Sequence, residues 1–376
     1  MIIDHISKNI IRLALFLDNK IPGIVSEIWI DKEFTAELRS KILSYEEVQE
    51  IINITRKQLC DIDEIRRKKY LNSILESLEF QIQTLNQRIP YSDFSEKAFG
   101  FRIERVAIHE IEKIETELRD LEEKSGMSRF EIFKQHSIIA NQYQEIFKKD
   151  IKFIKEKLPR FITDYPDKGF LLEVITNKPW SAFNSHVAPF QSKLTLNSDV
   201  SFNKIDLYRL ASHEAYAGHH SELSHKDKLL VNEGRGEHGL IITFSPQTFV
   251  SEAIAEGMYV LLNLLDKDSI AQMMGWYYDR LIFSLQNLAT FMFFDDNIAR
   301  RDIDDKFKHF GLTDKSRENL LNFSTDPLFG KYAPVYYSAF SFIKNIYQKT
   351  SKKEELIKVL FTKPCTPKLL KEQFAQ

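Results

Sequence analysis

The feature that most limits the fold of this chain is the helical periodicity of its first 160 residues. Apolar residues recur there at steps of three and four positions, for example over residues 44–60, 66–87 and 103–124. That spacing places them on one face of an α-helix. Glycine and proline, which interrupt helices, are scarce in this half. The sequence therefore predicts a mainly α-helical protein with a large, bundle-like helical body.

The pattern changes between residues 159 and 203, where prolines and glycines become frequent. Residues 169–176 and 191–201 alternate apolar and polar side chains, which indicates strands, and residues 239–244 form another extended run before Pro246. Helical periodicity resumes with Asp206 as the expected N-cap, and again from residue 248. We expect one domain over residues 1–376, with a helical half (1–160) and a second half (161–376) in which a small β element lies beside a candidate catalytic helix.

Charge and cysteine usage narrow the class of protein. The 52 basic and 54 acidic residues leave a net charge of −2, which gives no general attraction to nucleic acid or anionic membranes. Cys60 and Cys365 are far apart and have no metal-type spacing, which favours a reducing compartment. The first 20 residues lack the features of a secretory signal, and no segment reaches the roughly 20 apolar residues that span a bilayer. We therefore expect a cytoplasmic protein, and the sequence leaves its oligomeric state open.

Histidines cluster in the second half of the chain. Five of the ten lie between residues 213 and 238, and acidic residues accompany them. Two neutral imidazoles and a carboxylate suit Zn²⁺ and leave a fourth position for water. A glutamate beside the first histidine, Glu214 next to His213, could take a proton from that water. The pattern indicates a hydrolytic metal site.

The spacing of the histidines requires an interrupted helix. Zinc-binding helices carry their histidines four residues apart, but that position is Ala217, and the next histidines are His219 and His220. Six residues of regular helix span about 9 Å, whereas two nitrogens on one zinc lie roughly 3–4 Å apart. A break at Gly218 would bring His219, or alternatively His220, into place. The spacing alone fits a structural hydrogen-bond network equally well.

The sequence around these histidines resembles a bacterial family called domain of unknown function 885, which is grouped with the gluzincin zinc metallopeptidases. Residues 213–222 (HEAYAGHHSE) are similar to the family signature HEAYPGHH. Three further segments are similar to family elements, namely residues 194–199, 234–257 and 326–340. The chain departs from the family in carrying alanine where the family has Pro, Gly and Gly, at Ala217, Ala253 and Ala339.

The resemblance implies a role for each matched residue. It makes His213, His219 and Glu252 the zinc ligands and Glu214 the general base. Five other residues receive supporting roles. These are Glu256 as the acidic partner of a ligand histidine, His220 as an alternative ligand, Tyr336 (or its rival Tyr332) as a hydrogen-bond donor to the developing oxyanion, and His238 as a further stabilising group. Apart from the resemblance, we expect a strand over residues 194–197, which includes Asn197, to bind the substrate backbone by edge pairing.

The resulting hypothesis is a zinc-dependent metallopeptidase whose substrate is a peptide or small amide. Two other functions fit the same residues. One is a non-catalytic helical scaffold or binding protein with a vestigial metal site, which the intact Glu214 argues against. The other is a zinc hydrolase that acts on non-peptide amides or esters.

Overall fold

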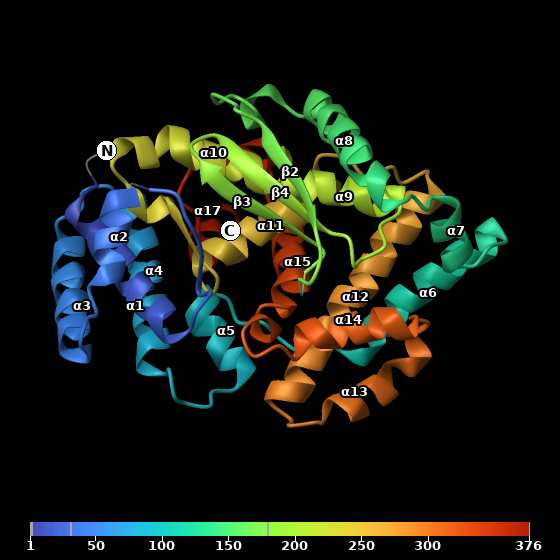
Figure 1. The fold of residues 1–376 in the computed structure, drawn as a ribbon, viewed down its shortest axis with the longest axis horizontal. Helices are drawn as coiled ribbons and strands as arrows, with labels where there is room; N and C mark the ends of the chain where they lie inside the picture. The colour runs from blue at the N-terminus through green and yellow to red at the C-terminus, as the bar shows by residue number, and fades with distance from the viewer. Residues whose placement is uncertain (1–2, 31, 179, 376) are drawn as a thin grey trace.

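The computed structural model describes residues 3–30, 32–178 and 180–375. It is mainly helical with two small sheets, as the sequence predicts (Figure 1). The α-helices of the N-terminal half are α1 (His5–Lys20), α2 (Lys32–Ser40), α3 (Tyr45–Cys60), α4 (Ile65–Gln83), α5 (Tyr91–Phe99), α6 (Ile108–Ser125), α7 (Arg129–Gln135) and α8 (Tyr143–Lys157). Those of the second half are α9 (Lys204–Glu214), α10 (His219–Leu229), α11 (Pro246–Leu261), α12 (Ile270–Phe294), α13 (Arg300–Phe307), α14 (Asp314–Ser324), α15 (Pro334–Lys349), α16 (Lys353–Thr362) and α17 (Pro367–Phe374).

Two helix starts differ from the prediction. The helix expected from residue 103 begins at Ile108, because the preceding backbone is extended and is held by side chains: Ile103 N–H donates to Ser95 Oγ at 2.9 Å. The helix expected to be capped by Asp206 begins at Lys204. Asn203 is its N-cap, and the Asp206 carboxylate bonds back to the Asn203 N–H at 3.1 Å. Asp206 is therefore the third residue of a capping box.

The larger sheet contains β2 (Phe170–Ile175), β3 (Ala182–Ala188) and β4 (Gln191–Asn197), in the order β2-β4-β3. β4 runs parallel to β2 and antiparallel to β3. It is therefore the middle strand and has no free edge, so the prediction that residues 194–197 pair with a substrate is wrong. β2 and β3 are the two edge strands of this sheet. A second, two-stranded sheet joins β1 (Val25–Ile28) to β5 (Leu240–Ile242).

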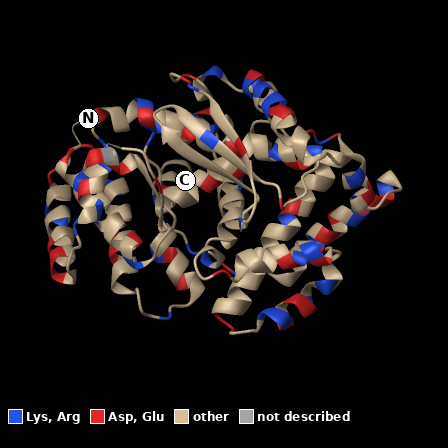
Figure 2. Ribbon diagram, in the orientation of Figure 1, with Lys and Arg blue, Asp and Glu red and all other residues tan. Residues whose placement is uncertain are grey.

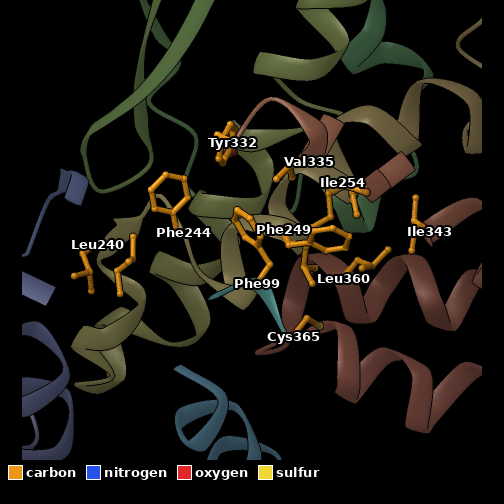
Figure 3. Packing of buried hydrophobic residues seen from close by; sticks show 14 of the residues in the cluster. Phe99, Leu240, Phe244, Phe249, Ile254, Tyr332, Val335, Ile343, Leu360 and Cys365 are labelled. Carbon is orange, nitrogen blue, oxygen red and sulfur yellow. The ribbon is translucent and has the colours of Figure 1, made fainter. Parts of the chain in front are cut away.

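The main hydrophobic core draws on both halves of the chain. α11 lies at its centre, and Figure 3 shows Phe249 and Ile254 of this helix among Phe99 from the N-terminal half and Val335 and Leu360 from the C-terminal end. A second cluster joins α12 to α6, α13 and α14. These two clusters fix α11 and α12.

Charged side chains lie mainly on the outer helices. In the view of Figure 2, basic and acidic residues alternate along α3, α8 and α13, which is consistent with the near-neutral net charge of −2. Among the described residues, no helix combines the length and apolar character that crossing a bilayer requires.

Candidate metal centre

The helix that carries the histidine motif is interrupted where the metal geometry requires it. α9 ends at Glu214, and α10 begins at His219 after a turn over residues 215–218. A Cβ atom on Gly218 would lie 1.7 Å from the carbonyl oxygen of His213, so the two backbone segments approach too closely for any other residue. The predicted break at Gly218 is confirmed, and the chain makes it with alanine at position 217 rather than proline.

The turn brings His213 and His219 to the same carboxylate. His213 Nε2 lies 3.6 Å from Glu252 Oε2, and His219 Nε2 lies 3.6 Å from Glu252 Oε1. One ligand atom from each of the three residues falls within 4.8 Å of the others. Glu252 Oε2 is buried and has no hydrogen-bond partner among the described residues. Two imidazoles and an unpartnered carboxylate oxygen are a donor set that fits a zinc ion with one open position.

His213 is oriented by a carboxylate on the next turn of α11. Its Nδ1 lies 3.1 Å from Glu256 Oε1, a contact of hydrogen-bond length with a poor angle. Arg280 forms an ion pair with Glu256, and Arg209 lies 3.5 Å away. Burial opposes ionisation of Glu256, but the charge of Arg280 and the contact with His213 outweigh it and lower its pKa to about 2. The negative charge of Glu256 beside Nδ1 favours a hydrogen on that nitrogen, which leaves the Nε2 lone pair of His213 facing Glu252.

The electrostatics at His219 differ. Burial lowers its pKa, but the nearby carboxylates, chiefly Glu222 and Glu252, outweigh that effect and raise the pKa to about 9. Burial raises the pKa of Glu252. Without a cation between them, these groups therefore hold protons more tightly than usual, and a metal ion would replace those protons.

The structure separates the two candidate tyrosines. Tyr332 donates its hydroxyl to Glu252 Oε1 at 2.7 Å, so it fixes the direction of that carboxylate. Tyr336 lines the neighbouring cavity, and its ring lies 6.4 Å from that of His213 and stacks on Phe283. Burial raises the pKa of Tyr336 well above its usual value, which keeps its hydroxyl protonated. Of the two, Tyr336 is the one placed to donate to a ligand in the cavity.

A cavity of about 400 Å³ opens onto His213 and Glu214, within the range of small-ligand sites. Aromatic side chains line much of its wall, namely Trp180, Phe202, Tyr278, Phe283, Phe323 and Tyr336. Glu214 itself is buried, and its Oε2 has no hydrogen-bond partner among the described residues. That oxygen is therefore available to accept a proton.

Three of the predicted site residues make contacts outside the group of His213, His219 and Glu252. The two ring nitrogens of His220 contact Ser192 Oγ at 2.8 Å and Asp167 Oδ1 at 3.2 Å, so it is not the second ligand. His238 stacks on Tyr70 with ring centroids 4.7 Å apart, and it lies neither among the three clustered groups nor on the cavity wall. Asn197 does reach that wall, but its amide N–H groups donate to the carbonyls of Lys178 and Trp180 at 2.9 and 3.0 Å.

The sequence did not reveal two buried residues that contact the histidines or their neighbours, Ser251 and Arg280. Ser251 contacts His219, and Arg280 forms an ion pair with Glu256, the carboxylate beside His213. The signal for Arg280 is a charged residue inside the largely apolar run of α12. Ser251 carries no comparable signal apart from preceding Glu252.

Comparisons with known proteins define the fold class only. No protein-family model and no curated protein sequence matches the chain. Two solved structures are similar in fold at 12% identity. A candidate lipoprotein from Colwellia psychrerythraea has a TM-score of 0.59 over 91% of this chain and 65% of its own length. A candidate lipoprotein of unknown function from Shewanella oneidensis has a TM-score of 0.53 over 96% of this chain and 70% of its own. The chain thus spans about two thirds of the length of each.

Proposed function

We propose that this protein is a zinc-dependent hydrolase, and specifically a metallopeptidase. The observation that carries the proposal is the convergence of His213, His219 and Glu252, with one ligand atom of each within 4.8 Å of the others. The resemblance of residues 213–222 to the gluzincin-like family supports the same assignment. When bound, zinc would lower the pKa of a water molecule and polarise a carbonyl group.

The protein's own groups would move the proton and stabilise charge. Glu214, whose Oε2 is buried and unpartnered among the described residues, would accept a proton from the attacking water and deliver it to the leaving amine. The protonated hydroxyl of Tyr336, on the cavity wall, would donate to the developing oxyanion. Tyr332 would hold Glu252 in its ligand orientation through the 2.7 Å hydrogen bond.

The outer edge of β3 offers a place for the substrate backbone. The Ser181 carbonyl accepts from Asn197 N–H at 2.8 Å and so faces β4. Because backbone groups alternate in direction along an antiparallel pair, those of Ala182 and Asn184 face outward. Ala182 also lines the cavity. An extended peptide would pair with this edge beside Glu214.

Metal analysis of the purified protein tests the proposal. We expect about one zinc per chain and a lower melting temperature after chelation, because an ion bound only by the folded state stabilises it. His219→Gln should abolish zinc binding, whereas His220→Gln is the matched control and should retain it, since His220 contacts Ser192 and Asp167 instead. A wild-type protein that takes up no zinc even after reconstitution would contradict the proposal.

Zinc affinity should depend on pH. The pKa of His219 is raised to about 9, so below pH 9 this ring carries a proton that must leave before Nε2 can bind the ion. The apparent affinity should rise up to about tenfold per pH unit as pH approaches 9 and level off above it. Competition with a chelator of known proton affinity measures this slope. A flat profile between pH 7 and 9 would contradict protonation of His219.

The two alternative functions make different predictions. A non-catalytic scaffold could bind peptides but would not hydrolyse them. The position of Glu214 beside the cavity argues against this alternative. A hydrolase of other amides or esters would cleave a small non-peptide amide or ester faster than a peptide that carries the same side chain next to the scissile bond. Profiling the zinc-loaded protein on such matched pairs separates the three functions.

We also propose a cytoplasmic location. The two structural neighbours are described as candidate lipoproteins, and a lipid anchor on this protein would instead place it at a membrane. Fractionation of cells that express the full-length natural gene distinguishes the two locations, because a lipid-anchored protein sediments with membranes and is released by detergent.

A further inference from the structure

We propose that Lys226, Glu222 and Ser251 form a hydrogen-bonded relay that positions His219 as a metal ligand; this inference rests on the proposed zinc site. Lys226 Nζ donates to Glu222 Oε1, and Ser251 Oγ donates to Glu222 Oε2. His219 Nδ1 lies 3.1 Å from Ser251 Oγ. The chain of contacts therefore runs from an ammonium group to the ring nitrogen that faces away from Glu252.

The direction of each hydrogen bond follows from the supply of protons. An ammonium group can only donate, and an ionised carboxylate can only accept, so Glu222 accepts from both neighbours. Ser251 has one hydroxyl proton, which it gives to Glu222. Its oxygen must then accept from His219, so Nδ1 carries the hydrogen. The ring is thereby fixed with Nε2 directed at Glu252, at 3.6 Å.

The relay joins the two helices that carry the ligands. Glu222 and Lys226 lie one turn apart on α10, which begins at His219, and Ser251 immediately precedes Glu252 on α11. The exposed fractions of Glu222, Lys226 and Ser251 are 1%, 6% and 8%. Burying such a charge pair is unfavourable unless its groups are hydrogen-bonded, and here Ser251 donates to the second oxygen of Glu222. His213 is held directly by a carboxylate, whereas His219 is held through a hydroxyl.

Ser251→Ala removes the hydroxyl with the least change of volume. In the zinc-loaded protein we expect metal affinity to fall about tenfold, as is typical when the support of a ligand histidine is lost. We also expect the visible spectrum of the cobalt-substituted protein to shift. Ser251→Thr keeps a hydroxyl and should restore both. Ser324→Ala is the matched control, because Ser324 is also buried and its hydroxyl donates to the Leu320 carbonyl of its own helix.

A second measurement does not need the metal. In protein labelled with ¹⁵N-histidine, the relay predicts a slowly exchanging Nδ1–H resonance for His219, assigned by its loss in His219→Gln. The resonance should disappear in Ser251→Ala and persist in Ser251→Thr and Ser324→Ala. If wild type and Ser251→Ala bind zinc equally well, the relay is overturned while the zinc site stands. If the wild type shows the resonance but binds no zinc, both the hydrolase and the positioning role are overturned, and the contacts are a structural network.

Discussion

Replacing Glu214 by glutamine is expected to lower kcat about 10³-fold on any peptide that the zinc-loaded protein cleaves, with zinc content unchanged. The amide keeps the size of the side chain but cannot take a proton from water, and general base catalysis contributes roughly 10²–10⁴-fold. Glu214 is not one of the three clustered residues of the proposed zinc site, so the metal should remain. The measurement is single-substrate kinetics together with metal analysis of the same sample.

The control for this variant is Glu233→Gln, which makes the same chemical change at an exposed position in the same half of the chain. It should retain full activity. Equal activity of Glu214→Gln and the wild type would show that another group accepts the proton. Loss of zinc from Glu214→Gln would instead indicate that Glu214 is a ligand.

Gly218→Ala is expected to be the most damaging single-methyl change in the site. Its Cβ would lie 1.7 Å from the His213 carbonyl oxygen and 2.6 Å from the carbonyl carbon. These are backbone atoms that cannot move without moving His213 itself. We expect a loss of unfolding free energy of more than about 3 kcal/mol and the loss of stoichiometric zinc, measured by denaturant titration and metal analysis.

Gly126→Ala separates this close contact from the general effect of adding a side chain to glycine. Gly126 has a φ of +68°, but a Cβ there meets nothing within 4 Å. Only left-handed backbone strain applies, which costs roughly 1 kcal/mol. If Gly218→Ala were as mild as Gly126→Ala and kept its zinc, the turn over residues 215–218 would have to be open enough to relax, contrary to the structure.

Local patterns in the sequence predicted much of the helical fold. Periodicity located α3 and α4 within a few residues of their ends. It placed the start of α6 five residues early. The extended segment before α6 is held by hydrogen bonds to the side chains of Ser95 and Asn287, which belong to α5 and α12, and periodicity within the segment does not show such bonds. β3 (AFNSHVA) went unpredicted because its buried polar residues, Asn184 and His186, break the apolar alternation.

The candidate site was predicted in part. The distance limit between two ligands on one ion is a geometric constraint, and together with the sequence it is enough to locate the break at Gly218. The choices between His219 and His220, and between Tyr332 and Tyr336, depended on where each side chain points. The spacing of residues in the sequence does not determine side-chain direction. Contacts with other elements determine it: His220 contacts Ser192 and Asp167, and Tyr332 donates to Glu252.

The central position of α11 has a consequence for shortened forms of the protein. This helix packs against α4 and α5 from the N-terminal half and against α15 and α17 from the second half. A form that stops before Tyr332 would leave one side of α11 exposed to water and would remove the hydrogen bond that Tyr332 donates to Glu252. Such a form would still contain His213, His219 and Glu252, but the direction of the Glu252 carboxylate would no longer be fixed. The presence of three potential ligands in a fragment would therefore not be enough to form the proposed zinc site.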